Sequence, residues 1–287
     1  MIYLNGVEIT GNTFPNNELN LLSIEEAINA RSQYKTNHFI LKYEDDRDLM
    51  ALFFAKKQVD LRTSDISNLS MYYCPYSRMD RAETIQTPFM LKFFCDFINQ
   101  MSFSKVEVFE PHSDVTGQLL NNFVKKDIVL ELLPTVMESI GFNPDKDFIV
   151  YPDETATKRY GFIGVDNKLF AKKKRDFATG HITDLEIVGE TNGEPFNALI
   201  VDDLCSRGGT FLYNAEKLKE RGANNIFLLI GHCENTIFDG KIFNSGLIEK
   251  VFTTDSILTK HHDWNNLKHR DKLKVYGMEL FSDENQS

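Results

Sequence analysis

The sequence has little of several features that mark common classes of protein. It holds four cysteines in 287 residues, and none stands in a C-x-x-C pair, so neither a disulfide framework nor a zinc finger is indicated. Its 32 Lys and Arg residues are outnumbered by 42 Asp and Glu residues, and a formal net charge of −10 argues against a protein that binds the phosphate backbone of nucleic acids. No apolar run is long enough to span a membrane, and the first residues lack the basic and apolar regions of a signal peptide. We therefore expect a reduced, cytoplasmic protein with neither a membrane nor a nucleic acid as partner.

The chain does contain enough apolar sequence for a large core. Hydrophobic residues make up 42% of it and charged residues 26%, which fits one large domain or two ordinary ones. Short apolar strands alternate with helical patterns, which predicts an α/β fold with parallel sheets flanked by helices. The expected strands are 70–76, 105–110, 147–153, 197–203 and 225–232, and the expected helices are 87–101, 127–141 (whole or interrupted at Pro134) and 210–222.

Polar clusters follow four of these strands. They are "SRMDR" at 77–81, "PHSD" at 111–114, "PDE" at 152–154 and "DDLCSRGGT" at 202–210. Open α/β sheets bind their ligands at the carboxyl ends of parallel strands. The four coincidences together indicate a ligand site more strongly than any one of them.

The last of these clusters has the features of a ribose-phosphate cradle. Gly208 and Gly209 allow the backbone of a strand-to-helix turn to approach an anion closely, and Thr210 could cap the helix or donate to a phosphate. Asp202 and Asp203 would repel that phosphate, but they suit vicinal ribose hydroxyls or a divalent cation. The spacing is not that of a Walker A loop. The simpler alternative is a plain turn that carries two solvated aspartates.

Five segments together carry a resemblance to a known family. "IVDDLCSRGGT" resembles the ribose-5-phosphate loop of phosphoribosyltransferases and of ribose-phosphate pyrophosphokinases (PRPP synthetases). Four other segments resemble parts of the pyrophosphokinases alone. Segment 72–98 is similar to their Arg-Gln-Asp-Arg segment, and segment 106–116 to the strand that ends in a histidine beside the metal-ATP. Segment 14–18 is similar to their Phe-x-Asp-x-Glu adenine site, and segment 172–176 to their Lys-x-Arg catalytic loop. They follow one another in the order of that family, from about residue 14 to 260.

The resemblance implies a fold and a reaction. It implies two phosphoribosyltransferase-like, Rossmann-like halves, with an ATP-binding half at 1–135 and a half at 136–287 that holds the ribose loop and a catalytic lid. The enzyme would be a diphosphotransferase that moves the β,γ-diphosphoryl group of ATP to the 1-hydroxyl of a ribose 5-phosphate moiety and releases AMP, with Mg²⁺ as cofactor. An adenine loop that serves a neighbouring subunit implies a homo-oligomer, with the ATP site between halves or subunits.

Roles for individual residues follow from the same resemblance. The ATP-binding residues would be Phe14, Asn16, Glu18, Arg78, Asp80, Arg81 and His112. The catalytic residues would be Lys173, Arg175 and His112, and the residues near the metal would be His112 and Asp153. The residues that bind the ribose phosphate would be Asp202, Asp203, Ser206, Arg207, Gly208, Gly209 and Thr210.

The chain departs from the family pattern at several of these positions. Met79 replaces the family glutamine, Asn16 replaces an aspartate, and "ETAT" replaces the glycines after Asp153. Ser206 and Arg207 replace an Asp-Thr pair, which suggests a 5′-extended acceptor such as ADP-ribose, used in nucleotide or NAD salvage, as the alternative to ribose 5-phosphate. The Lys-x-Arg register could also slip by one residue to Lys172 or Lys174.

Other interpretations remain open at this stage. A phosphoribosyltransferase that uses PRPP would share the 202–210 loop but would not depend on ATP. A non-catalytic, regulatory relative would have lost its catalytic residues, whereas Lys173, Arg175, His112 and Asp202 are all present here. Locally, the basic run at 172–175 could be a solvated face, and Arg207 could pair with a surface acid.

Overall fold

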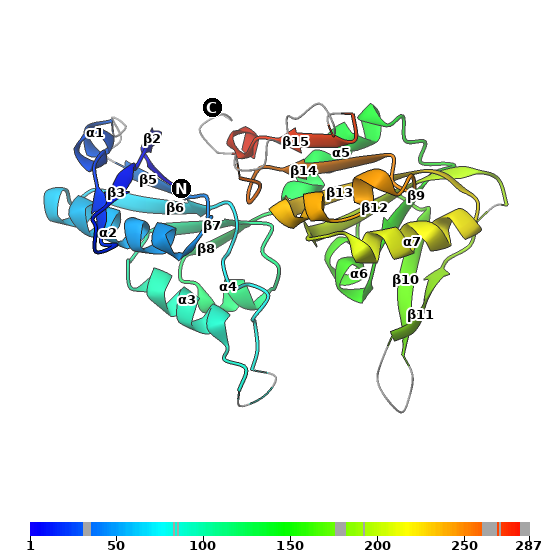
Figure 1. Ribbon diagram of the computed structural model, residues 1–287, viewed down its shortest axis with the longest axis horizontal. Helices are drawn as coiled ribbons and strands as arrows, with labels where there is room; N and C mark the ends of the chain where they lie inside the picture. Colours follow the sequence, from blue (N-terminus) through cyan, green and yellow to red (C-terminus); the bar gives the residue numbers. More distant parts are fainter. Residues whose placement is uncertain are drawn as a thin grey trace. The chain divides into compact units, whose positions relative to one another are not determined.

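The computed structural model of the protein forms two compact units, Met1–Asp127 and Ile128–Ser287 (Figure 1). The residues that it describes are 1–30, 36–82, 84, 86–175, 182–191, 193–259, 269 and 271–281, without the side chains of 173–175 and 182–184. The division lies ahead of position 135, at which the boundary is expected from the sequence. A boundary at 135 would cut helix α5 (Ile128–Ser139), whose buried residues include both Ile128 and Val136.

The first unit is built on a six-stranded sheet. Its strand order is β2-β1-β5-β6-β7-β8, in which β5 to β8 run parallel and β1 is antiparallel to both of its neighbours. These strands are β1 (Ile2–Leu4), β2 (Val7–Glu8), β5 (Thr36–Leu41), β6 (Ile66–Met71), β7 (Lys105–Phe109) and β8 (Phe123–Lys126). Strand β6 ends five residues before the predicted end at 76, because Pro75 cannot donate a sheet hydrogen bond and Tyr76 has a positive φ of 62°.

Four helices and a small hairpin complete this unit. They are α1 (Ile24–Asn29), α2 (Asp46–Arg62), α3 (Met90–Asn99), α4 (Val115–Leu119) and the antiparallel pair β3 (Gly11–Thr13) and β4 (Leu19–Leu21). Helices α2 and α3 pack on one face of the sheet, with Leu52 and Phe94 in the same core as Leu69 of β6. Helix α3 begins later than predicted, after Phe89, and Phe93 is exposed. Its buried residues are Leu91, Phe94, Cys95 and Ile98.

The second unit is built on a seven-stranded sheet of order β11-β10-β9-β12-β13-β14-β15. All neighbouring strands are parallel except the β10–β11 pair. The strands are β9 (Phe148–Tyr151), β10 (Lys168–Arg175), β11 (Ile182–Val188), β12 (Phe196–Cys205), β13 (Ala223–Cys233), β14 (Lys250–Thr254) and β15 (Leu273–Tyr276). The two central strands, β12 and β13, are longer than predicted, because their pairing continues to Cys205 and Cys233.

Helices cover both faces of this second sheet. Figure 1 shows α5 (Ile128–Ser139) and α7 (Gly209–Glu220) on opposite sides of it, and α6 (Glu154–Tyr160) follows β9. Pro134 lies inside α5 without interrupting it. Helix α7 ends just before Gly222, whose φ of +93° is the left-handed conformation predicted for its closing glycine. Single helical turns form η1 (Asn235–Asp239), η2 (Ile242–Asn244) and η3 (Met278–Phe281). No helix in the described ranges is long and apolar enough to cross a membrane.

Candidate functional site

Strand β12 carries the two aspartates of the predicted ribose site. Asp202 and Asp203 are neighbours near the end of this strand, and an interaction between their carboxyls is among the effects that raise the pKa of Asp202. Asp203 is buried, and Arg159 Nη2 of α6 lies 3.5 Å from its Oδ2. Asp202 is half-buried, and its Oδ1 accepts a 2.9 Å hydrogen bond from the backbone N–H of Asp203. The arrangement therefore gives Asp203 a structural partner and leaves Asp202 as the better candidate for a ligand.

The Asp202 carboxyl lies in an unfavourable place for a negative charge. Burial raises its pKa well above the ordinary value, and the nearby carboxyls of Asp203 and Asp153 raise it further. Such a group either holds its proton or requires a compensating cation or hydroxyl donor. This property is typical of a binding site rather than of a solvated turn.

The loop after β12 leads directly into the start of helix α7. Gly208 caps the helix with φ +79°, and a Cβ added there would lie 2.0 Å from Cδ1 of Ile242, so no side chain fits. Gly209 is the first helical residue, and a Cβ there would meet no atom within 4 Å. The first helical residue, Gly209, therefore faces open space, which suits an anion at this helix N-terminus.

The remaining residues of this loop have different environments. Ser206 Oγ lies 2.9 Å from Oγ1 of Thr236, while Arg207 is exposed. Thr210 does not cap the helix as predicted, because the cap is two residues earlier and Thr210 already belongs to the first turn. It is exposed, and its carbonyl accepts a hydrogen bond from the Asn214 side chain.

Asp153 caps helix α6. Its Oδ1 accepts hydrogen bonds from the backbone N–H groups of Thr155 (2.9 Å) and Ala156 (3.0 Å). The "ETAT" segment that replaces the family glycines is thus the first turn of a helix rather than an open loop.

The carboxyls of Asp153 and Asp202 are candidate ligands for the magnesium ion that the resemblance implies. Among the described residues no group of three or more His, Cys, Asp or Glu side chains has the arrangement of a metal cage. Magnesium does not need one, because it keeps several waters and is held by one or two carboxylates together with substrate phosphates. Asp153 and Asp202, whose mutual repulsion raises the Asp202 pKa, are oxygen donors of that kind.

The predicted catalytic lid falls on the β10–β11 hairpin. Lys173 is paired with Leu185 and Arg175 with Ile182, with a bulge between Lys174 and Arg175. The two residues are therefore part of a strand rather than of a loop. Their side chains, and the glycine-containing segment at 176–181, lie outside the described residues.

In the first unit, the structure brings two of the predicted clusters together. Asp80 Oδ1 forms a 2.8 Å ion pair with Nε of Arg81, and Ser113 Oγ donates a 2.7 Å hydrogen bond to Asp80 Oδ2. The bond from Arg81 is the largest of the effects that hold the pKa of Asp80 below its ordinary value, and the charge of His112 adds to it. Arg78 is exposed in the preceding turn.

The predicted adenine residues lie in the turn of the β3–β4 hairpin. The backbone N–H of Phe14 donates to the carbonyl of Glu18 at 2.9 Å, and Asn16 Oδ1 accepts a bond from the backbone N–H of Glu18 at 3.3 Å. Phe14 is 50% exposed, and it lines a cavity of about 490 Å³ with Glu18 and, from α2, Arg47 and Phe54. Asn16 does not line this cavity, because its side chain holds the turn.

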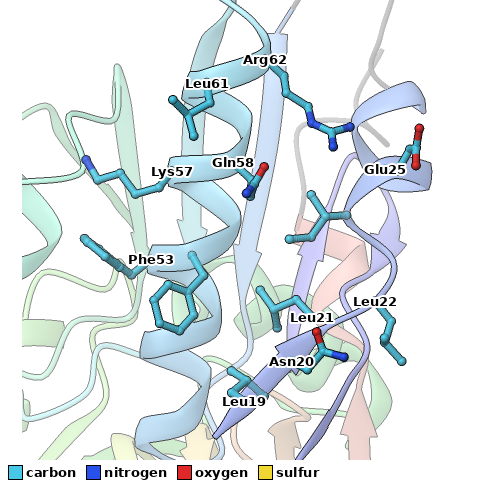
Figure 2. A pocket seen from close by; sticks show the side chains of 12 residues that line it. Leu19, Asn20, Leu21, Leu22, Glu25, Phe53, Lys57, Gln58, Leu61 and Arg62 are labelled. Carbon is cyan, nitrogen blue, oxygen red and sulfur yellow. The ribbon is translucent and has the colours of Figure 1, made fainter.

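A second, adjoining cavity of about 520 Å³ runs between α2 and the segment from β4 to α1 (Figure 2). Figure 2 shows Leu21, Phe53 and Leu61 along it, with Arg62 at one end. None of the predicted site residues lines it.

Sequence reasoning missed three residues next to the predicted site. Arg159 contacts Asp203, and Thr236 and Glu234 contact Ser206 directly or through one another. A basic residue six positions after a strand-end aspartate was a weak signal for Arg159. The sequence after strand 225–232 carries no pattern that would single out the other two.

Comparisons with known proteins find relatives among the enzymes that the sequence segments resemble. Residues 172–280 match the sequence model of the phosphoribosyl synthetase-associated domain. A ribose-phosphate pyrophosphokinase from Mycoplasmopsis pulmonis is 26% identical over 273 residues, which is 91% of this chain and 79% of the relative. One from Mycoplasma pneumoniae is 26% identical over 259 residues, 87% of this chain and 76% of the relative.

The fold has a solved counterpart as well. The phosphoribosylpyrophosphate synthetase from Mycobacterium smegmatis superposes with a TM-score of 0.71, at 16% identity, over 96% of this chain and 87% of that one. The prediction of an α/β fold with two mostly parallel, helix-flanked sheets is confirmed. So is the resemblance that the sequence segments indicated, and with it the prediction that the chain is related to diphosphotransferase enzymes.

Proposed function

Because the chain is a divergent relative of the ribose-phosphate pyrophosphokinases, we propose that it transfers the β,γ-diphosphoryl group of ATP to the 1-hydroxyl of ribose 5-phosphate. The products are AMP and phosphoribosyl pyrophosphate. The observation that carries this proposal is the 202–210 loop. There a carboxyl with a raised pKa precedes a helix N-terminus at which glycine occupies both leading positions.

The second unit supplies the acceptor site in this proposal. Backbone N–H groups at Gly209 and Thr210 donate to the 5-phosphate, assisted by the positive end of the α7 dipole. Asp202 accepts hydrogen bonds from the ribose hydroxyls, which compensates its buried charge. Asp203 acts through Arg159 to fix the strand end, rather than by touching the sugar.

The first unit supplies the ATP site. Arg78, Arg81 and His112 bind the phosphates, and Asp80 holds Arg81 in position through their 2.8 Å ion pair. Phe14 stacks on the adenine, with Glu18 beside it in the 490 Å³ cavity. Asn16 stabilises the turn that presents them.

The chemistry is mainly the stabilisation of charge. Negative charge shifts onto the bridging phosphoryl oxygen as the bond to AMP breaks, so a cation held there lowers the barrier. Lys173 and Arg175 provide that cation from the β10–β11 hairpin. Bound Mg²⁺ would neutralise the phosphate oxygens, with Asp153 and Asp202 as the residues of the second unit that would hold it or its water, and His112 would face the metal-ATP from the first unit.

Two finer points belong to the same proposal. The acceptor is ribose 5-phosphate rather than an extended acceptor such as ADP-ribose, because the two relatives described above are named for a ribose phosphate. The protein is a homo-oligomer, since the exposed hairpin at Phe14 would serve a neighbouring copy; light scattering of the purified protein would test this.

Mass spectrometry of the reaction tests the proposal directly. The purified protein is incubated with Mg-ATP and equal concentrations of ribose 5-phosphate and ADP-ribose, with the Lys173→Ala variant as control. We expect AMP and phosphoribosyl pyrophosphate in equal amounts. AMP without a diphosphorylated sugar would contradict the proposal, and a diphosphorylated ADP-ribose as main product would move the acceptor to the extended class. Consumption of phosphoribosyl pyrophosphate and a base without ATP would instead identify a phosphoribosyltransferase.

A further inference from the structure

Three side chains connect the phosphate loop to the segment that follows strand β13. Ser206 Oγ lies 2.9 Å from Oγ1 of Thr236, and Thr236 Oγ1 lies 3.1 Å from Oε2 of Glu234. The backbone N–H of Glu234 donates to the carbonyl of Cys205 at 2.8 Å, which keeps the two segments aligned. All three side chains are half-buried.

The carboxylate of Glu234 sets the direction of these hydrogen bonds. A carboxylate only accepts, so the single hydroxyl proton of Thr236 is directed to Glu234. Thr236 then accepts from Ser206, whose own single proton is directed to Thr236 Oγ1. Towards a ligand, Ser206 Oγ can offer only lone pairs.

The two segments approach each other closely at two glycines. A Cβ added to Gly240 would lie 2.1 Å from the carbonyl oxygen of Arg207, and one added to Gly208 would lie 2.0 Å from Ile242 Cδ1. Each segment thus contributes a glycine where the other comes closest. The Ser206–Thr236 contact therefore joins two segments that are packed closely together.

We infer that Thr236 and Glu234 are positioning residues that withhold the Ser206 proton from the 5-phosphate of the acceptor and so weaken its binding. A phosphate dianion accepts hydrogen bonds and gains nothing from a lone pair that faces it. The inference rests on the proposed function, because it assumes that the 206–210 loop binds the phosphate of ribose 5-phosphate. The inference predicts that breaking the hydrogen bonds between Ser206, Thr236 and Glu234 tightens the binding of ribose 5-phosphate. A merely structural role for these residues predicts weaker binding.

Two substitutions release the proton in different ways. Thr236→Val keeps the shape of the side chain but removes the acceptor of the Ser206 proton. Glu234→Gln can turn its amide towards Thr236 and donate, which allows Thr236 to donate to Ser206 and Ser206 to donate to the phosphate. Thr236→Ser keeps the hydroxyl and is the matched control.

Calorimetric titration with ribose 5-phosphate, in the presence of Mg²⁺ and a non-hydrolysable ATP analogue, measures the effect. We expect Thr236→Val and Glu234→Gln each to lower the Kd by about tenfold, which corresponds to one hydrogen bond to a charged group. The double variant should bind no more tightly than either single variant, because both release the same proton. Thr236→Ser should bind as the unchanged protein does. In turnover assays the KM for ribose 5-phosphate should fall while kcat changes little.

Three results would overturn the inference. Weaker binding by Thr236→Val would show that the hydroxyl supports the loop instead of restraining it. If the double variant lowered the Kd by the product of the two single effects, Glu234→Gln would act independently of Thr236, through the loss of its charge. That result would leave the proposed function intact. Failure of the unchanged protein to bind ribose 5-phosphate would contradict the proposed function together with the inference.

Discussion

Ser113 Oγ donates a 2.7 Å hydrogen bond to Oδ2 of Asp80, across 33 positions of the chain. The contact joins the segments that follow two neighbouring parallel strands, β6 and β7, and places Asp80 between the hydroxyl of Ser113 and the guanidinium of Arg81. Both donors lower the pKa of the Asp80 carboxyl, which opposes the effect of its burial. Asp80 is therefore an ionised anchor that fixes Arg81.

Replacing Ser113 with alanine tests this anchor. The variant removes one of the two donors, so the pKa of Asp80 should rise towards its ordinary value and Arg81 should be held less firmly. We expect the Kd for ATP to increase about three- to tenfold, the effect of one hydrogen bond to a charged group. Calorimetry gives the affinity, and a carboxyl NMR titration gives the pKa. Ser139→Ala, which removes a hydroxyl from α5 in the other unit, is the control. Equal ATP affinity in both variants would contradict the role of the anchor.

The two glycines at the start of α7 should respond differently to alanine. At Gly208, φ is +79° and the added Cβ would meet Ile242 at 2.0 Å, so Gly208→Ala should lower the free energy of unfolding by about 2 kcal/mol or more. At Gly209 the backbone is helical and the space is open, so Gly209→Ala should change stability by less than about 0.5 kcal/mol. Its methyl group would nevertheless occupy the approach of the phosphate and weaken ribose 5-phosphate binding. Urea denaturation and calorimetry check the two halves of this prediction. A stable Gly208→Ala variant would contradict the first half.

The parallel core of the fold could be predicted because buried strands appear in the sequence as apolar runs. Strands β9, β12 and β13 contain such runs, whereas β7, with sequence KVEVF, alternates charged and apolar residues before its last position. Strand β8, with sequence FVKK, and strand β10, with sequence KLFAKKKR, do not have this pattern. They pair at or near the edges of their sheets, where charged side chains are tolerated, so only the tertiary pairing identifies them as strands.

In the candidate site, too, residues that depend on tertiary contacts could not be predicted from the sequence. The 202–210 loop was predictable because strand, loop and helix start are adjacent in sequence. The roles of Asp202 and Asp203 stay a prediction, and the sequence did not indicate that β12 continues past both of them. Arg159 had only a weak signal in the sequence, since its contact with Asp203 depends on how α6 packs against β12.

The β10–β11 hairpin should carry the catalytic cation. Lys173→Ala should lower kcat by about 10²-fold or more while the Kd for ATP changes little, because its contact strengthens as charge moves in the transition state. Lys172→Ala is the matched control from the neighbouring position of the strand. Rapid-quench kinetics and ATP titration separate the two parameters. A larger loss in Lys172→Ala would shift the register by one residue, and unchanged kcat in both would leave the basic run as a solvated face.

Asp203 and Arg159 form an ion pair with little exposure to solvent, so breaking it should affect folding first. The exposed fractions of the two side chains are 6% and 10%, and loss of one partner leaves the other charge buried. We expect Asp203→Asn to lower the free energy of unfolding by about 3 kcal/mol. Thermal and urea unfolding measure this, and Asp145→Asn on the exposed surface is the control. If Asp203→Asn loses acceptor affinity without losing stability, the residue contacts the sugar after all.

Substitution of Asp202 should have the opposite effect on stability, because its negative charge destabilises the folded protein. Burial, followed by the carboxyls of Asp203 and Asp153, raises its pKa, so the folded state binds the proton more tightly than the unfolded state does. The stabilisation is complete below the ordinary pKa of about 3.9 and is lost as the pH rises through the higher folded value. Asn cannot ionise, so Asp202→Asn should have a higher Tm than the unchanged protein at pH 7, in EDTA, and an equal Tm near pH 4. The same variant should bind ribose 5-phosphate about tenfold more weakly, because an acceptor for its hydroxyls is lost, while ATP binding stays the same. A lower Tm at pH 7 would mean that Asp202 stabilises the fold and is not held there for a ligand.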